Sequence, residues 1–140
     1  MKDISSRIVY SRNTKISVEE FIDVLKRSTL DARRPVGDKD RIKSMLDHAN
    51  VIITAWDQNT LVGVSRALSD FSFCCYLSDL AVDVAYQKQG IGKRLIEETH
   101  AASGLSGKLI LLAAPAATEY YPKIGMEKFP HCFVIQEKTE

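Results

Sequence analysis

The sequence predicts an α/β (α+β) domain with a mixed, mostly antiparallel twisted sheet flanked by helices. Three observations support this fold class. Two β-branched and aromatic runs within residues 51–68 flank a turn at 57–60, as in a β-hairpin. Residues 79–98 pass from an apolar strand through a glycine-containing turn into an amphipathic helix. The run 108–114 is continuously apolar, which is typical of a strand buried on both faces and parallel to its neighbour.

The first 50 residues are predicted to supply one strand and two helices. Ser17 and Glu20 have the spacing of a capping box, in which the two residues satisfy each other's main-chain N–H groups at a helix start. A loop carries Arg33 and Arg34, which most simply belong to a solvated turn; a place beside a substrate groove is the alternative. The expected elements are a strand over 8–10, a helix over 18–27, the loop over 31–37 and a helix from about 38 to 48.

The remaining 90 residues are predicted to form three consecutive strands, followed by a helix, a strand, a helix and a last strand. Pro122 interrupts the last helix, and Pro115 ends the strand before it. A strand followed by a helix and a parallel strand implies a right-handed crossover. The expected strands cover 51–56, 61–68, 75–82, 108–114 and about 132–136, and the expected helices cover about 92–103 and 116–124.

Length and composition bound the class of protein. The 140 residues, 45% of them apolar and 26% charged, are expected to form one domain over 1–140. A net charge of +1 gives no electrostatic reason to expect nucleic acid or an anionic membrane as partner. We find no signal-peptide core and no run near ~20 apolar residues, so a cytoplasmic protein is expected. Three cysteines without metal spacing are expected to be reduced thiols, with no metal.

The strand-to-helix junction within residues 79–98 is a candidate anion site. Main-chain N–H groups and the positive end of the helix dipole meet in front of the strand, where a phosphate is well placed. A Walker loop is excluded, because Gln87 stands where its first glycine belongs and Arg94 follows Gly92-Lys93. A dinucleotide fingerprint is excluded, because its third glycine is replaced by Leu95. The alternative is a glycine-bearing turn without a ligand.

Two segments resemble the GNAT superfamily of N-acetyltransferases. Gln87-x-x-Gly90-x-Gly92, after the strand Leu80–Val82, is similar to the family's acetyl-CoA loop, Gln/Arg-x-x-Gly-x-Gly/Ala. Residues 119–126 are similar to its Phe-Tyr-x-Lys-x-Gly-Phe segment, with Tyr121 on the family's tyrosine. The resemblance is close over about residues 50–135. Family members often carry an Asn that bonds pantetheine, and here Ala114 takes its place.

This resemblance implies the GNAT fold, with splayed parallel central strands, and acetyl-CoA as co-substrate. In the family the loop amides bind the CoA pyrophosphate and the preceding strand pairs with the pantetheine arm through its main chain. The resemblance therefore assigns the following cofactor-binding residues: Leu80, Ala81, Val82, Gln87, Lys88, Gln89, Gly90, Ile91, Gly92, Lys93 and Tyr121. A side chain at Gly90 or Gly92 is expected to keep the main chain away from the pyrophosphate.

Two residues are candidates for catalysis. Tyr121 is placed by the resemblance to protonate the leaving thiolate, a step in which a positioned acid contributes about 10²–10⁴ in rate. Asp79 is expected where the strand approaches the thioester, as a base acting directly or through water. Each has a structural alternative, a packed tyrosine and a hydrogen-bonded strand aspartate. Main-chain N–H groups of residues 80–82 are expected to polarise the thioester carbonyl.

The sequence thus predicts an N-acetyltransferase that moves acetyl from acetyl-CoA to a primary amine by direct attack in a ternary complex. A small-molecule amine is the expected acceptor. The alternatives are a protein or peptide N-acetyltransferase and a catalytically silent CoA-binding regulatory module. A deep groove near Phe71, Phe73 and Tyr76 favours the small amine, whereas an open acidic slot favours a peptide. Superfamily members are often dimers, so a homodimer is an open alternative to a monomer.

Overall fold

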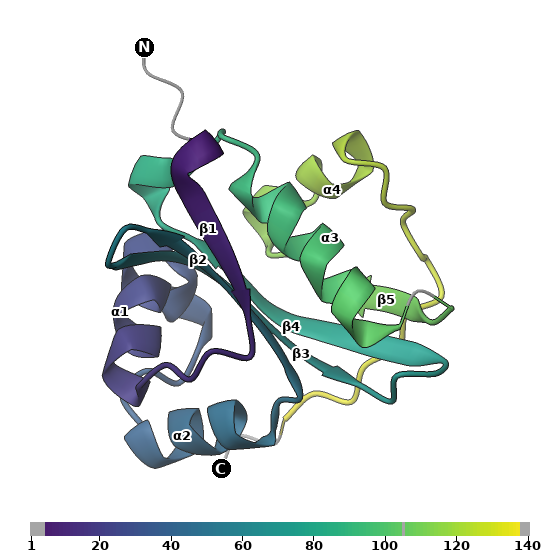
Figure 1. Cartoon of the computed structure of the whole chain (residues 1–140). Helices are drawn as coiled ribbons and strands as arrows, with labels where there is room; N and C mark the ends of the chain where they lie inside the picture. Colours follow the sequence, from purple (N-terminus) through teal and green to yellow (C-terminus); the bar gives the residue numbers. More distant parts are fainter. Residues whose placement is uncertain (1–4, 105, 138–140) are drawn as a thin grey trace.

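The computed structural model describes residues 5–104 and 106–137, which contain one five-stranded sheet in the order β1-β2-β3-β4-β5 (Figure 1). Neighbouring strands are antiparallel except for β4 and β5, which are parallel. This confirms the predicted mixed, mostly antiparallel sheet. The strands are β1 (Ile8–Arg12), β2 (Val51–Asp57), β3 (Thr60–Ser69), β4 (Cys74–Val82) and β5 (Lys108–Leu111).

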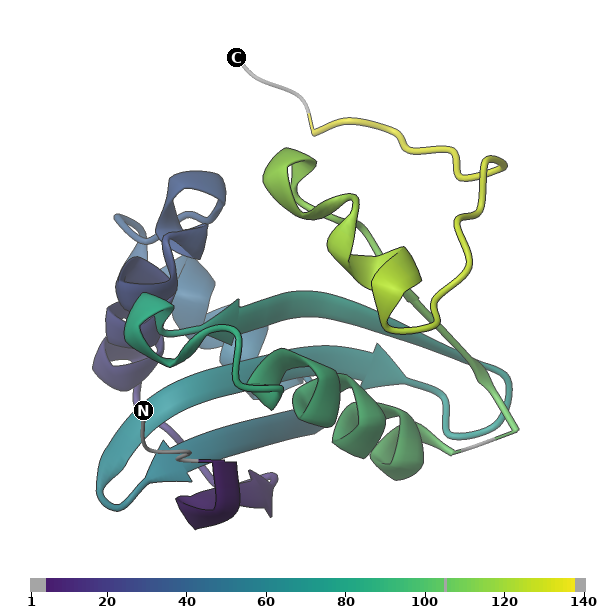
Figure 2. The same cartoon turned by 90° about the horizontal axis from the view of Figure 1, so that it is seen from above.

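Helices cover both faces of this sheet. Figures 1 and 2 show α1 and α2 on one face and α3 on the other. Short 3-10 turns connect several elements; one of them, Leu30–Arg33, joins α1 to α2. The α-helices are α1 (Val18–Ser28), α2 (Lys39–His48), α3 (Ile91–Ser103) and α4 (Tyr120–Lys123).

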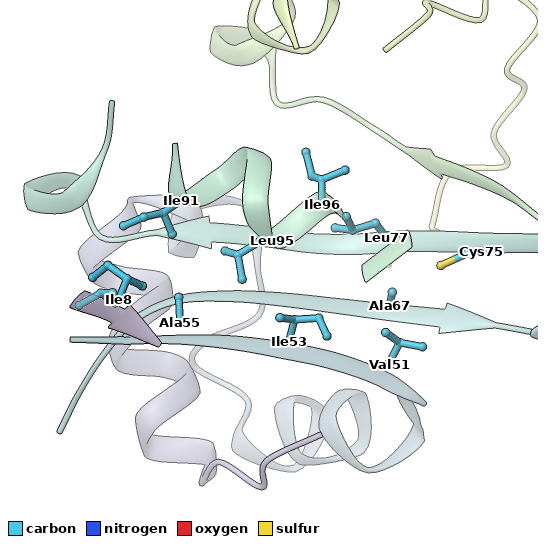
Figure 3. Packing of buried hydrophobic residues seen from close by; sticks show 11 residues of the cluster. Ile8, Val51, Ile53, Ala55, Ala67, Cys75, Leu77, Ile91, Leu95 and Ile96 are labelled. Carbon is cyan, nitrogen blue, oxygen red and sulfur yellow. The ribbon is translucent and has the colours of Figure 1, made fainter. Parts of the chain in front are cut away.

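Each face of the sheet has its own hydrophobic core. Beneath α3, residues such as Ile53, Leu77 and Leu95 pack together with no more than 2% exposure (Figure 3). Beneath α1 and α2, Phe21 and Ile42 belong to a second cluster and are fully buried. Burying one large apolar side chain contributes about 1.5–3 kcal/mol, so the two cores together fix the sheet between its helices.

The helix starts confirm the sequence signals for α1 and α2. The Ser17 N–H donates to Glu20 Oε1 at 2.9 Å, and the Glu20 N–H donates to Ser17 Oγ at 3.0 Å, which is the predicted capping box. At α2, the Asp38 carboxylate accepts from the Arg41 N–H at 3.1 Å. The connection between α1 and α2 lines the groove described below.

Two predictions for the C-terminal third are wrong. No strand forms at 132–136; residues 126–137 have no helix or strand, and Phe133 and Ile135 are 92% and 99% exposed. The strand at 108–114 stops at Leu111 and lies at the sheet edge, so Ile110 is 47% exposed rather than buried on both faces. Since an apolar run looks the same in a central and an edge strand, the pattern alone did not separate the two.

The described residues 5–104 and 106–137 contain no helix that is long and apolar enough to cross a membrane. Within the same ranges, no group of three or more His, Cys, Asp or Glu side chains is arranged to hold a metal ion. The three cysteines are free thiols; Cys74 is exposed and its neighbour Cys75 is buried, because adjacent residues of β4 point to opposite faces of the sheet.

Candidate active site

The parallel strands β4 and β5 separate half-way along β4. Residues Cys74–Leu77 pair with Lys108–Leu111, and the described pairing ends there. Beyond this point β4 continues to Val82, paired on its other side with β3. The Val82 carbonyl accepts a hydrogen bond from the Gln87 side chain at 3.0 Å, so it faces the open side. Because main-chain groups alternate along a strand, the N–H and C=O of Leu80 face the same side.

The N-terminus of α3 lies directly after this open stretch. Gly90 is the N-cap residue, with φ of +83°, and its carbonyl accepts from the Arg94 N–H at 3.1 Å. The first N–H groups of a helix, here those of Ile91, Gly92 and Lys93, have no acceptor within the helix. The N-cap residue Gly90 has no side chain that could cap this end, and the Tyr120 hydroxyl accepts from the Lys93 N–H. The junction therefore presents N–H donors and the positive end of the helix dipole to one place.

The other predicted residues of this loop contribute in different ways. Lys88 adopts a left-handed conformation with φ of +64° and is exposed, as is Lys93. Gln89 is half-buried. The Ile91 side chain is buried in the core, which leaves only its N–H for a ligand.

The two glycines of the loop are needed for different reasons. A Cβ on Gly90 would meet nothing within 4 Å, so the positive φ, not space, requires glycine there. At Gly92 a Cβ would lie 3.2 Å from the Tyr120 hydroxyl oxygen and 3.9 Å from a Val82 methyl group. The main chain at Gly92 is therefore closely approached by a neighbouring side chain.

Tyr121 lines the same groove as Leu80 and Val82 of the open stretch of β4. It is half-buried, packs on the core beneath α3, and meets the Tyr120 ring edge-to-face with centroids 5.2 Å apart. Burial raises the pKa of Tyr121, and the neighbouring Tyr120 adds to the increase. A phenol with a raised pKa stays protonated at neutral pH, which is the state that a proton donor needs.

Asp79 is fully buried and lies between two guanidinium groups. One carboxylate oxygen accepts from Arg34 Nε and the other from Arg66 Nε. The arginines are held further: Arg34 donates to the Ser78 carbonyl at 2.7 Å, and Arg66 donates to the Ser78 hydroxyl at 3.0 Å and to the Met45 carbonyl at 3.1 Å. With both oxygens engaged and 0% exposure, Asp79 has no oxygen directed at solvent.

A β-bulge in β4 explains why the Asp79 side chain points toward Arg34 and Arg66. The register with β3 shifts between Arg66 and Ala67, because Asp79 pairs with Arg66 whereas Leu77 pairs with Ala67. Ser78 is the extra residue. Before the bulge Leu77 faces the core beneath α3; after it Ala81 faces the core beneath α1 and α2. The sequence alternation did not reveal the bulge, although a single arginine inside the apolar strand 60–69 was a signal that it needed a buried partner.

An open groove of about 1260 Å³ joins these features. The open stretch of β4, Tyr121 and Gln87 line one part of it, and Ala114, at the place of the family's Asn, also lines it. Its far part is lined by Arg33, Arg34, Arg41 and Arg66, which we call the arginine end. Of the predicted aromatics, Tyr76 lines the groove, whereas Phe73 lines a separate pocket of about 240 Å³ and Phe71 is exposed.

Comparison with known proteins identifies the family. The profile described as "Acetyltransferase (GNAT) domain" matches residues 23–132. The chain belongs to the GNAT acetyltransferase family. This GNAT chain is also 31% identical over 136 residues to "Uncharacterized N-acetyltransferase ycf52" of Porphyra purpurea, covering 91% of the chain and 75% of that protein.

Other relatives match a smaller part of the chain. It is 38% identical over 77 residues to "Histone acetyltransferase TAP1" of Glycine max, covering 53% of this chain and 33% of that protein. The chain thus spans about a third of the length of the curated relatives that it matches first.

Solved structures share the fold at low sequence identity. A GNAT family acetyltransferase from Streptococcus pneumoniae superimposes with a TM-score of 0.72 at 22% identity, covering 95% of this chain and 99% of that one. AAC(6')-Iy, in complex with the bisubstrate analogue CoA-S-monomethyl-acetylneamine, gives 0.70 at 11% identity, covering 94% and 99%. The predicted GNAT fold is confirmed.

Proposed function

We propose that this GNAT chain is an acetyl-CoA-dependent N-acetyltransferase that transfers acetyl directly to an amine in a ternary complex. The observation that supports this most strongly is the N-terminus of α3, which begins at a glycine N-cap and lies beside the open edge of β4. A diphosphate at the helix and a thioester beside the strand fit that arrangement. The fold is shared with AAC(6')-Iy, which binds a CoA-containing analogue.

In this proposal the main chain holds the cofactor. The N–H groups of Gly90 to Lys93 donate to the pyrophosphate, and the loop residues Gln87 to Gln89 surround it. The main chain of Leu80 and Val82 pairs with the pantetheine arm, with Ala81 between them packed on the opposite core. Ala114 offers no amide to the arm, so the main chain and solvent would supply that contact.

The chemistry needs an electrophile, an oxyanion site and a proton donor. The neutral amine attacks the thioester carbonyl carbon, and the tetrahedral oxyanion forms beside the N–H of Leu80. When the C–S bond breaks, the phenol of Tyr121 donates its proton to the departing thiolate. The amine releases a proton to solvent in the groove, and solvent returns a proton to the Tyr121 phenolate, so the protons balance.

For Asp79 we propose a positioning role instead of the base role. Its two oxygens fix Arg34 and Arg66, and through them the bulge at Ser78. A carboxylate that is fully buried and engaged by two guanidinium groups is poorly placed to take a proton from an amine. The positive charge that surrounds it also favours the neutral, nucleophilic form of a bound amine.

A small amine is the acceptor that the groove favours. Its far part carries four arginines and one lining carboxylate, Glu137, so its net positive charge would repel a lysine-rich peptide. The groove is also open, and the chain is similar over 77 residues to a protein named as a histone acetyltransferase. These two observations keep a protein or peptide acceptor as the second candidate.

The experiment is release of free CoA thiol from acetyl-CoA with a panel of small amines and lysine-containing peptides. We expect release that depends on a small amine, together with the acetylated amine by mass spectrometry. Release only with peptides would support the second candidate. Tight acetyl-CoA binding without release for any acceptor would instead indicate a silent CoA-binding module.

A further inference from the structure

We propose that the acceptor amine carries a carboxylate, and that the arginine end of the groove binds it. This inference rests on the proposed function and adds the chemical class of the acceptor. The arginine end consists of the guanidinium groups of Arg33, Arg34, Arg41 and Arg66. Three of these residues come from the stretch 33–41, and Arg66 joins them only in the fold.

The charges at this end do not balance. Four guanidinium groups face two carboxylates, Asp79 and Glu137, among the described residues around the groove. The contact between Arg41 and Glu137, 3.3 Å, is exposed on both sides, and such pairs are weak and exchange partners readily. The groove therefore holds an excess of positive charge that an anionic group on the substrate can neutralise.

Part of this excess is buried. Arg34 and Arg66 share the single carboxylate of Asp79, and their side chains are only 20% and 8% exposed. A partly buried charge without an opposite charge is costly, which favours an anion next to it. Each guanidinium also keeps N–H groups beyond those used in the described bonds, since arginine has five donors.

Arg33 is the most accessible member of the arginine end. It is exposed at the rim, and its side chain makes no described hydrogen bond or ion pair. Its carbonyl accepts from Arg34 at 2.7 Å, so its main chain is fixed beside the buried cluster. A guanidinium forms two parallel hydrogen bonds to a carboxylate, a geometry that suits an amino-acid head group.

The arginine end lies away from the place proposed for the cofactor phosphates. The bulge at Ser78 and Val82 are four residues apart, or about 13 Å along β4, and the Val82 side chain lies beside Gly92 at the start of α3. In the proposed complex the thioester lies between them. An amine at the thioester thus leaves its carboxylate directed toward the arginines, whereas the pyrophosphate stays at α3.

The test compares acceptors that differ only in the carboxylate. Tyrosine, tyrosinamide and tyramine, and likewise lysine, lysinamide and cadaverine, would be assayed for kcat/KM with the parent chain, Arg33→Ala and Arg33→Lys. Arg12→Ala, an exposed arginine on the far edge strand β1, is the matched control. The KM for acetyl-CoA is measured for each variant.

We expect the parent to prefer the free acid over its amide by about tenfold or more, which is the usual contribution of a charged hydrogen bond. Arg33→Ala should reduce that preference several-fold, Arg33→Lys should restore part of it, and Arg12→Ala should keep it, all at constant KM for acetyl-CoA. Equal use of acid and amide, or a preference that survives Arg33→Ala, would overturn the inference while the acetyltransferase remains. A raised KM for acetyl-CoA in Arg33→Ala would also overturn it, because the arginine would then hold the cofactor. No turnover with any amine would contradict the proposed function itself.

Discussion

The two ends of the groove are built by different means. At the N-terminus of α3, the groups available to a ligand are main-chain N–H groups, presented by glycines and a helix start. At the arginine end, they are side chains from the α1–α2 connection, α2 and β3, joined through Asp79. A main-chain site suits a cofactor that never changes, whereas a side-chain site can be altered residue by residue to suit a new acceptor. Under the proposed function, the N-terminus of α3, which we call the helix end, is the general part of the site and the arginine end is the specific part.

Tyr121 stands between the two ends, and its removal has the largest expected effect. Tyr121→Phe should lower kcat by about 10²–10⁴-fold, because the departing thiolate loses its proton donor, while the Kd for acetyl-CoA stays nearly constant. In the parent, kcat should fall only as pH rises through the raised pKa of Tyr121, above the ordinary phenol value of about 10. This limb should be absent in the variant.

Tyr10→Phe is the control for that experiment. Burial also raises the pKa of Tyr10, but it lies on β1, at the opposite edge of the sheet from β5. Its replacement should leave kcat unchanged. Equal kcat in the parent and Tyr121→Phe would remove Tyr121 from the mechanism.

Removing Asp79 tests whether the arginine end depends on a buried ion pair. Asp79→Asn leaves two largely buried guanidinium groups without their carboxylate, so the free energy of unfolding should fall by about 3–5 kcal/mol in urea denaturation. Asp47→Asn, in an exposed pair with Lys43, should cost far less. A positioning role predicts that the residual kcat/KM keeps its pH profile; loss of its acid limb with little change in stability would make Asp79 the base.

The helix end can be broken at a single glycine. Gly90→Val places a β-branched residue at φ of +83°, which costs about 1–3 kcal/mol, so the Kd for acetyl-CoA should rise about tenfold to a hundredfold by calorimetry. Gly37→Val is the control, because a Cβ there meets nothing within 4 Å and its φ is not positive. Parent-like affinity in Gly90→Val would disconnect this loop from the cofactor.

The smallest effect is expected at Asp70, whose carboxylate occupies an anion site formed by main-chain N–H groups of the same chain. Asp70, in the turn between β3 and β4, accepts from the N–H groups of Ser72, Phe73 and Cys74 at 2.9, 2.7 and 3.0 Å. These bonds, first of all that of Phe73, lower the pKa of Asp70 to about 2. The folded pKa lies below the unfolded one, so this stabilisation is present above about pH 4 and is lost as pH falls to about 2.

The Tm of Asp70→Asn should therefore lie below that of the parent at pH 6 and approach it in acid. The Asn side chain keeps an acceptor oxygen but carries no charge to titrate. A Tm difference that stays constant from pH 6 to pH 2 would show that the charge of Asp70 does not matter.

The same contrast explains what the sequence could predict. The helix end depends on neighbours in the chain, so the spacing of Gln87, Gly90 and Gly92 predicted the strand–helix junction and, together with the segment around Tyr121, the family. The capping box of Ser17 and Glu20 is equally local and was also confirmed. Family membership then supplied the splayed strands.

The arginine end could not be predicted in this way. Arg34 and Asp79 are 45 residues apart in the sequence, and the bulge at Ser78 reverses the alternation that would have placed Asp79. Arg34 was predicted most simply to lie in a solvated turn, yet it lines the groove and pairs with Asp79. The strand expected at 132–136 failed for a related reason, since strand propensity does not show whether a neighbouring edge is used.

The most direct test of the account is a titration of the ¹⁵N-labelled chain with acetyl-CoA, followed by amide NMR shifts. If main-chain N–H groups at the start of α3 bind the pyrophosphate, the largest shifts should fall on residues 90–93, with a second set on residues 78–82 of β4. If binding saturates while the chemical shifts of these amides stay constant and other residues shift instead, the proposed cofactor site is contradicted.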